Sequence, residues 1–369
     1  MRGLEFPIIG TLSKGQSASG RKVFDLNSPA GRKKYFQAKV GDEIQHIKRY
    51  LNKSNFIAYL LGKKNSGKGT YAKMFIEIFS TRGGSASGRG EDRIVHLSVG
   101  DLVREIHANW TEFSKSPDFE KLKKLYRGYI SFDDAVDSLL GRSTERLLPT
   151  EFVLALLKLR ISQLGGKSIF IDGLPRESDQ VSYSLYFRDL AGYTQAIDLF
   201  VLIDIPESVI NERIKHRVVC PLCQTSRNSK LLITSKVGFD IKSKEFYLVC
   251  DNPSCQGARM EPKEGDNLGI EPIKGRLIKD EEVIRTVFSL HGVPKILLRN
   301  HVPLAQAAKF FDDYELTPEY GFKYEPKSKK VKVIEKPWSV KDDNGEECYS
   351  LLAAPVVIAF LKQLVEILP

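Results

Sequence analysis

Four short apolar runs recur along the middle of the chain, and stretches with apolar residues at helical spacing separate them. The runs are FIAYLL (56–61), IVHLS (94–98), SIFIDG (168–173) and LFVLIDI (199–205). Such runs are typical of strands that are buried on both faces, as in a parallel sheet with helical crossovers. The pattern therefore predicts an α/β core with a parallel sheet flanked by helices. We expect this core to comprise residues 55–217 and 276–369.

The segments before and within this core have a different texture. Residues 1–54 begin Gly- and Ser-rich and turn helical from about Arg32 to Leu51, which predicts a partly helical extension packed on the outside of the core. Residues 80–92 read STRGGSASGRGED, which predicts a flexible surface loop. Residues 218–275 lack helical spacing, so we expect a small β-rich insertion there.

The last part of the chain, residues 315–369, combines a strand pattern with a helical one. The stretch KKVKVIEKPWSVKDDNGEECYSLL predicts a hairpin with Asn344-Gly345 as its turn. A final helix is expected from about Ala353 to Ile367. No internal repeat is present in the sequence.

Composition narrows the class of protein without naming a function. The 369 residues are 42% hydrophobic and 28% charged, which is typical of a globular protein with a substantial core. The longest apolar stretch, Leu351 to Leu361, is shorter than the roughly 20 residues that cross a bilayer. No signal-peptide pattern opens the sequence, so we expect a cytoplasmic protein without membrane contact.

The chain carries an excess of positive charge. Its 56 Lys and Arg residues against 46 Asp and Glu give a net charge of +10. This balance is compatible with nucleic acid or with a polyphosphate ligand, and equally with a solvated basic surface. Charge therefore leaves the ligand class open.

A glycine-rich loop follows the first apolar run directly and precedes a helical stretch. It reads GKKNSGKGT and fits the phosphate-loop pattern GxxxxGK between strand and helix. Backbone N–H groups of such a loop curl round phosphate oxygens, and the helix N-terminus favours negative charge. Lys68 would reach the β- and γ-phosphates. The residues expected to bind ATP here are Gly62, Asn65, Ser66, Gly67, Lys68, Gly69 and Thr70.

Four of the five cysteines form two close pairs. Cys220 and Cys223 precede Cys250 and Cys255, and Cys348 lies alone in the tail. Clustered cysteines in a chain without an export signal point to metal rather than to disulfides. Four thiolates make a closed tetrahedral zinc site without an open position for chemistry. We therefore predict a structural zinc ion in the insertion.

The chain resembles the adenylate kinase family of nucleoside monophosphate kinases. The resemblance rests on GKGT, HLSVGDLVR (96–104), FIDGLPR with Gln180, and IDIPESVINERIKHR (203–217), which occur in this order. It covers about residues 56–290. It implies an NMP-binding helical insertion at about 98–150, a zinc-binding lid at 218–275, and a Mg²⁺-dependent transfer of the ATP γ-phosphate to AMP, giving two ADP.

The resemblance also assigns roles to individual residues. It places Arg104 and Arg176 on the monophosphate, and Asp172 on magnesium through water. Arg213 packs on the ATP base and Arg217 grips phosphates, so the two belong to the ATP site, and Arg276 is the best match to a further catalytic arginine after the lid. The residues that the family places around the monophosphate are Ser98, Val99, Arg104, Leu148, Gly173, Arg176 and Gln180. In this assignment Gln180 reads the base, and the backbone around Leu148 covers the monophosphate.

Direct phosphoryl transfer explains why such a site is rich in positive charge. The acceptor phosphate is already an anion, so the protein needs no nucleophile of its own. It must position both nucleotides and offset the negative charge of the transition state. Lys68, with the arginines assigned above, would supply that charge.

The sequence departs from the family pattern at three places. Val99 replaces the usual threonine, a hydroxyl that helps contact the acceptor base. Asn65 stands where glycine is common, and asparagine tolerates left-handed backbone better than most residues. After the insertion, Arg276 matches the first arginine of the family, whereas Arg285 lies two positions short of the second.

Three readings of function remain open at this point, beside that of a degenerate, inactive relative of the family. The first is an adenylate kinase, expected as a monomer that binds ATP and AMP and no nucleic acid. The second keeps the enzyme but changes the acceptor to UMP, CMP or another monophosphate, because of Val99. The third is a zinc-ribbon nucleic-acid-binding ATPase or adaptor, for which arginines at the monophosphate positions would be superfluous.

Overall fold

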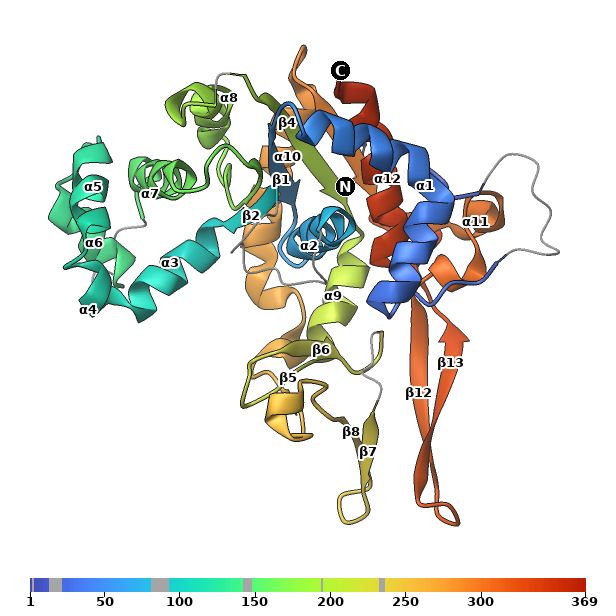
Figure 1. The fold of residues 1–369 in the computed structure, drawn as a ribbon. Helices are drawn as coiled ribbons and strands as arrows, with labels where there is room; N and C mark the ends of the chain where they lie inside the picture. Colours follow the sequence, from blue (N-terminus) through green and yellow to red (C-terminus); the bar gives the residue numbers. More distant parts are fainter. Residues whose placement is uncertain (2, 13–21, 81–92, 142–147, 194, 232–235) are drawn as a thin grey trace.

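The computed structural model of the chain describes residues 1, 3–12, 22–80, 93–141, 148–193, 195–231 and 236–369. Its centre is a five-stranded parallel sheet with the strand order β10-β4-β1-β3-β2 (Figure 1). The strands are β1 (Phe56–Gly62), β2 (Ile94–Ser98), β3 (Ser168–Asp172), β4 (Ile197–Asp204) and β10 (Lys295–Arg299). The parallel sheet predicted from the apolar runs is thus confirmed. The loop expected over residues 80–92 falls almost wholly outside the described residues.

Helices cover both faces of the sheet, so every residue of β1 is buried. Phe56, Ala58 and Leu60 face one apolar cluster, and the alternate residues Ile57, Tyr59 and Leu61 face the other. The first cluster is completed by α1 (Pro29–Leu51), α2 (Lys68–Phe79) and α12 (Ala353–Ile367), and the second by α7 (Thr150–Ser162), α8 (Gln180–Leu190) and α10 (Lys274–Ser289). This packing explains why the strands read as continuous apolar runs.

The N-terminal helix α1 packs against α12 and α2 (Figure 1). Tyr35, Val40 and Ile47 on α1 are fully buried, and they belong to the main apolar cluster. The helix begins at Pro29, where the side chain of Ser28 accepts a hydrogen bond from Gly31 N. The predicted helix is therefore present, and it contributes to the core as well as covering it.

A helical region projects from one edge of the sheet (Figure 1). It has its own apolar cluster, which includes Leu122, Val136 and Phe152. Its helices are α3 (Val99–Ala108), α4 (Trp110–Phe113), α5 (Pro117–Leu125), α6 (Phe132–Leu139) and the shared α7.

The region with four cysteines consists of short strands between α9 (Glu207–Lys215) and α10. We call residues 217–262 the cysteine region. Its strands are β5 (Arg217–Val219), β6 (Ser226–Asn228), β7 (Val237–Asp240), β8 (Glu245–Leu248) and β9 (Glu261–Pro262), in the sheets β6-β5-β9 and β7-β8. A β-rich insertion was predicted here, and short strands are what the structure contains.

The tail forms two hairpins where the sequence predicted one. β12 (Pro318–Glu325) pairs with β13 (Lys330–Pro337), and β14 (Ser339–Lys341) pairs with β15 (Glu347–Ser350). Asn344-Gly345 lies in the turn of the second hairpin, as predicted. The assignment of β13 to that same hairpin was wrong, because Pro337 cannot donate a ladder hydrogen bond and separates β13 from β14.

The remaining elements are short, and they connect the sheet to the tail. They are β11 (His301–Pro303), α11 (Leu304–Phe310) and the 3₁₀ helices Pro253–Cys255, Asp266–Leu268, Glu271–Ile273 and Asp313–Glu315. Across the described ranges, no helix combines the length and the apolar character that a membrane span requires.

Candidate functional site

The glycine-rich loop joins the end of β1 to the start of α2, at the carboxyl edge of the sheet. Gly67 and Asn65 both adopt left-handed backbone, with φ of 99° and 66°. A side chain on Gly62 would place its Cβ 2.5 Å from Ser66 Oγ, so this position requires glycine. The Lys68 side chain folds back over the loop and donates a hydrogen bond of 2.8 Å to the carbonyl of Gly62. The loop thus has the geometry of a phosphate-binding turn at a helix N-terminus.

Charged side chains from three segments gather around Lys68. Burial lowers the pKa of Lys68, while the nearby carboxylates of Asp172 and Asp280 act in the opposite direction. Arg176 and Arg276 are close enough to Lys68 to disfavour its charge further. Burial also lowers the pKa of Arg176, and Arg276 adds to this effect. The three cations outnumber the two carboxylates, and an excess of positive charge at one edge of a sheet is suited to a polyphosphate ligand.

Arg104 and Arg176 converge on Gly100, from α3 and from the segment after β3. A Cβ atom on Gly100 would lie 3.4 Å from Arg104 Nη1 and 3.5 Å from Arg176 Nη2. Gly173 leaves room for the same guanidinium, because a Cβ there would lie 2.7 Å from Arg176 Nη2. Arg176 Nε is buried without a hydrogen-bond partner among the described residues. The two arginines therefore frame one space that an anion could enter.

Gln180 and its neighbours lie beside these arginines. Gln180 Oε1 accepts a hydrogen bond of 2.9 Å from Arg176 N, and its Nε2 donates one of 2.9 Å to Thr150 Oγ1. Thr150 begins α7, two residues after Leu148, so the backbone expected to cover the monophosphate is near this amide. To read a base, the Gln180 amide would have to exchange these protein partners for the ligand.

Ser98 and Val99 stand where β2 meets α3. Ser98 Oγ accepts a hydrogen bond of 3.2 Å from Asp101 N and so caps α3. Val99 is buried with only 4% of its surface exposed, and it packs into the second apolar cluster. The position at which the family pattern has a threonine is therefore part of the core in this chain.

A cavity of about 930 Å³ lies on the other side of the loop. Residues 65–71 of the loop and α2 line it, together with Asp172. Arg213 and Arg217 also line it, and Arg213 donates a hydrogen bond of 3.5 Å to Asn65 O and one of 3.4 Å to Asn300 Oδ1. Arg217 forms a bidentate ion pair with Asp266, at 2.5 and 2.6 Å. A nucleotide whose phosphates rest on the loop would extend into this cavity.

The structure separates the two arginines that follow the cysteine region. Arg276 Nε lies 2.8 Å from Asp280 Oδ1, and it is close enough to Lys68 and Arg176 to affect both. Arg285 instead pairs with Glu281 on the same helix, at 2.6 Å. Of the two, Arg276 is therefore the one that lies with the phosphate loop.

The four cysteines predicted as zinc ligands come together. Their sulfur atoms all lie within 4.8 Å of one another, and Cys223 and Cys250 are 3.6 Å apart. A tetrahedral zinc ion with bonds of about 2.3 Å requires sulfur atoms about 3.8 Å apart, so the donor set and its spacing fit this metal. Cys348 is buried on β15, in a different part of the molecule.

Three residues near the loop were not identified from the sequence. Lys63 is buried and pairs with three carboxylates, and Asp280 accepts a hydrogen bond of 2.8 Å from Lys64 N. Asn300 is fully buried, donates to Tyr71 Oη at 2.8 Å and accepts from Arg213. Only Asp280 had a signal in the sequence, since it lies four positions after Arg276 on a helix and ion pairs form at this spacing.

Comparisons with known proteins agree with the motifs. No family model matches the chain. It is 31% identical to the adenylate kinase of Kosmotoga olearia over 166 residues, which are 44% of this chain and 60% of that protein. It is 31% identical to the adenylate kinase of Clostridium novyi over 172 residues (46% and 63%) and 32% identical to that of Clostridium acetobutylicum over 168 residues (45% and 61%).

These matches and the site geometry define an adenylate kinase-like region in this chain. The predicted resemblance to adenylate kinases is thus confirmed. The chain spans about three fifths of the length of the curated relatives that it matches. More than half of the chain lies outside each of these matches.

Proposed function

We propose that the protein is a nucleoside monophosphate kinase that transfers the γ-phosphate of ATP to AMP. The observation that carries the proposal is the gathering of Lys68, Arg176 and Arg276 at the phosphate loop. Arg176 approaches Gly100 and Gly173, and Arg276 pairs with Asp280, which accepts a hydrogen bond from Lys64 N of the loop. A donor triphosphate on the loop and an acceptor phosphate between Arg104 and Arg176 would meet at this point. The adenylate kinase relatives support the same reaction.

In this proposal the protein supplies position and charge. Lys68 holds the β- and γ-phosphates, and Arg176 holds the acceptor phosphate against them. Arg276 lies near both cations and stabilises the negative charge that spreads over the transferring group. Arg213 and Arg217 act from the cavity side, on the donor. No protein group has to accept a proton, because the acceptor phosphate attacks as an anion.

Asp172 is the residue that would hold magnesium, through water. It ends β3 and lines the cavity of about 930 Å³, which we call the donor cavity. Its side chain is 20% exposed. Bound there, Mg²⁺ would offset the negative charge of the phosphates. A partly exposed carboxylate beside the phosphate loop fits an outer-sphere role, since Mg²⁺ keeps several of its waters.

The acceptor base distinguishes the proposed reaction from its nearest alternative. Gln180 offers an amide that both donates and accepts, which matches the edge of adenine. Val99 contributes no hydroxyl at the place where relatives carry one, which favours a relaxed preference among AMP, UMP and CMP. Losing one such hydrogen bond costs about 0.5–1.5 kcal/mol, so AMP remains the expected acceptor.

A zinc-ribbon ATPase or adaptor is the alternative from another class. Such a protein would need the donor cavity but not a second anion site. The approach of Arg104 and Arg176 to Gly100 favours the kinase, because these two cations come from outside the phosphate loop and an ATPase that activates water has no need of them.

The cysteine region is proposed as a zinc-stabilised lid over the donor nucleotide. Ser226, Arg227 and Asn228 of this region line the donor cavity, and so does Arg217 at its start. Cys220, Cys223, Cys250 and Cys255 would hold one structural zinc ion. A small region with little apolar core gains stability from such a clip.

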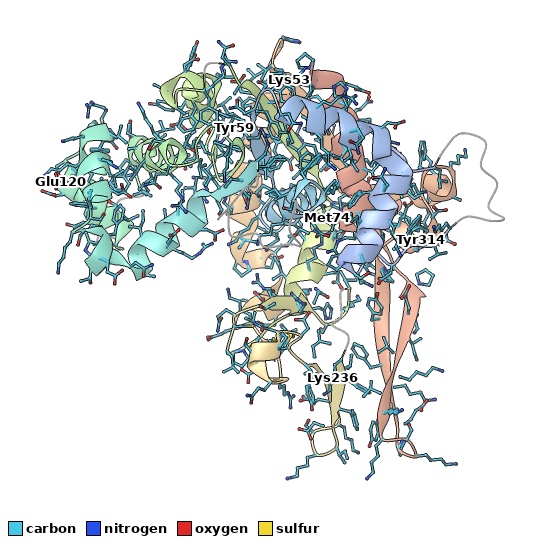
Figure 2. The ribbon with its side chains drawn as sticks, in the orientation of Figure 1. Lys53, Tyr59, Met74, Glu120, Lys236 and Tyr314 are labelled. Carbon is cyan, nitrogen blue, oxygen red and sulfur yellow. The ribbon has the colours of Figure 1, made fainter. Side chains whose placement is uncertain are left out.

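The test is an assay of purified protein with MgATP and each monophosphate in turn, with diphosphate formation as the readout. AMP is expected to give the highest kcat/KM. Lys68→Ala is expected to lower phosphoryl transfer by orders of magnitude with an unchanged melting temperature. Lys53→Ala is the matched control, because Lys53 lies far from the loop (Figure 2). Near-normal activity of Lys68→Ala would overturn the proposal.

A further inference from the structure

The donor cavity has a wall that the adenylate kinase motifs do not account for. Leu26, Asn27 and Arg32, from the segment before α1 and its first turn, line the cavity together with residues of the phosphate loop. These residues precede the first family motif by about thirty positions of sequence. The N-terminal extension therefore reaches a site that the rest of the chain would otherwise form alone.

This segment is held firmly in place by Arg32. Its guanidinium donates to the backbone carbonyls of Leu26 and Asn27, at 3.2 and 3.0 Å. The same group forms a bidentate pair with Glu77, at 3.1 and 2.9 Å, and only 14% of the Arg32 side chain is exposed. A bidentate guanidinium–carboxylate pair fixes the orientation of the Arg32 side chain as well as its distance from Glu77.

The backbone turns tightly just before Arg32. We call the contacts of Arg32 with Leu26, Asn27 and Glu77 the clamp. A Cβ atom on Gly31 would lie 1.9 Å from Asp25 O, so the chain can turn this tightly only with glycine here. Ser28 caps α1 through Gly31 N at 3.1 Å. The backbone conformation of residues 25–32 is therefore specified by Gly31 and Ser28.

The clamp attaches the wall to the helix that starts at the phosphate loop. Glu77 follows Lys68 by nine residues on α2, a distance of about 13 Å along the helix axis. Met74, between them on α2, also lines the cavity and lies beside α1 (Figure 2). A donor with its terminal phosphates on the loop would therefore present its ribose and base to the wall.

The chemistry of the wall suits an adenine base. Leu26 and Met74 offer apolar surface, as do Leu351 and Leu352 on the tail side of the cavity. Asn27 is exposed, and its side-chain amide makes no hydrogen bond to another described residue. An asparagine amide can donate to and accept from the edge of adenine at the same time.

We infer that residues 25–32 form a specificity wall for the donor nucleotide, in which Asn27 contacts the base of a purine triphosphate and Arg32 positions Asn27. This inference rests on the proposed function, since it assumes that the cavity takes the donor. It adds a donor contact from a part of the chain that lies before the kinase core.

Equilibrium binding tests the inference without relying on turnover. Isothermal titration of the full chain with ATP, GTP and CTP, each with Mg²⁺ and without acceptor, gives the donor preference. Asn27→Ala is expected to raise the Kd for ATP about threefold to tenfold, and to change the Kd for CTP by less than about twofold. Asn52→Ala, an exposed asparagine at the other end of α1, is the matched control and should change neither.

A second variant separates positioning from direct contact. Arg32→Met keeps the length of the stem but loses the clamp, so it should weaken ATP binding as Asn27→Ala does, with little further loss in the double variant. If Arg32→Met proves unstable, Asn27→Asp serves instead, because it keeps an acceptor and loses both donors. It should lower the ATP-over-CTP preference.

The outcomes distinguish this inference from the proposed function. If the native protein binds ATP and Lys68→Ala abolishes that binding, but Asn27→Ala leaves the preference among triphosphates unchanged, the wall is refuted and the kinase stands. If the native protein binds no triphosphate, the proposed function fails, and the wall fails with it.

Discussion

The side-chain ammonium of Lys63 lies 3.1 Å from Asp343 Oδ2, although 280 positions of sequence separate the two residues. Lys63 belongs to the phosphate loop, and Asp343 lies in the turn between β14 and β15. Glu207 at the start of α9 and Glu281 on α10 lie 2.7 and 3.1 Å from the same ammonium. Burial acts to lower the pKa of Lys63, but these carboxylates outweigh it and raise the pKa above its usual value. One buried cation thus joins the loop to three distant elements.

Replacing this cation should destabilise the whole fold. Lys63 is only 1% exposed, and Lys63→Met would remove the cation that Glu207, Glu281 and Asp343 share. Glu281 would keep Arg285 and Asp343 would keep the N-terminal ammonium, so Glu207 would lose the most. Breaking a buried ion pair in this way costs about 3–5 kcal/mol. Urea unfolding of the native protein, Lys63→Met and Lys64→Met measures the effect. Lys64 is the matched control, since its side chain is exposed in the same loop. Equal losses in both variants would contradict a special role for Lys63.

The cysteine region is held against the tail by aromatic side chains. The rings of Phe239 on β7 and Tyr324 on β12 stack with centroids 4.3 Å apart. Phe246 and Phe322 lie beside them at 5.6 Å, and Tyr320 N donates to Lys230 O at 2.8 Å. Figure 1 shows the two hairpins projecting side by side from the body of the molecule.

Removing one ring of this stack should loosen the cysteine region without affecting the core. Tyr324→Ala is expected to cost about 0.5–1.5 kcal/mol locally, and amide hydrogen exchange in residues 237–248 should accelerate. Tyr186→Ala provides the control, because Tyr186 is 68% exposed on α8. Unchanged exchange in residues 237–248 would show that the stack does not restrain this region.

The sheet and the loop were predictable because their signals are local. Buried strands have to be apolar on both faces, and a phosphate loop needs its glycines and lysine at fixed spacing. The partners of Lys63 were not predictable in this way. A lysine beside a phosphate loop reads as solvated or as a phosphate ligand, and its carboxylates lie far along the chain. The strand β12 was missed although Tyr320, Phe322 and Tyr324 recur at every second position, which is a local strand signal.

The candidate site shows the same division. Family motifs indicated Arg104, Arg176 and Gln180, and the structure places them next to one another. Asn27 and Asn300 lie outside the family motifs, so the motifs gave no information on them. Both reach the site only through the folding of distant parts of the chain. The preference for Arg276 over Arg285 depended on a sequence match alone. Both arginines pair with a carboxylate on α10, and the physical difference is that Arg276 lies near Lys68 and Arg176.

Loss of the metal ligands should destabilise the cysteine region alone. The change is Cys220→Ser with Cys223→Ser, and the control is Cys348→Ser, which removes a buried thiol elsewhere. Elemental analysis of native protein should give about one zinc ion per chain. The double variant should lose the metal and melt at a lower temperature, because metal binding contributes folding free energy. Native protein without zinc and with four freely reactive thiols would contradict the site.

Because His301 is buried, we expect the free energy of unfolding to decrease at acidic pH. It is 4% exposed, and Nε2 accepts a hydrogen bond of 3.2 Å from Arg299 Nε, so the imidazole is neutral. Burial, with Arg299 nearby, lowers the pKa of His301 from 6.5 to about 3. Between these values the unfolded chain binds a proton that the folded chain does not, so the free energy of unfolding decreases as the pH falls. The decrease is about 1.4 kcal/mol per pH unit for one such group.

A comparison of variants isolates this effect from the carboxylates that titrate in the same range. His301→Gln keeps an acceptor for Arg299 and has no proton to bind. The native protein should therefore lose stability relative to His301→Gln as the pH is lowered from about 7 to 4, and the difference should be constant above about pH 7.5. His291→Gln, at an exposed histidine, should track the native protein throughout. Parallel curves for the native protein and His301→Gln would mean that His301 is protonated in the folded state.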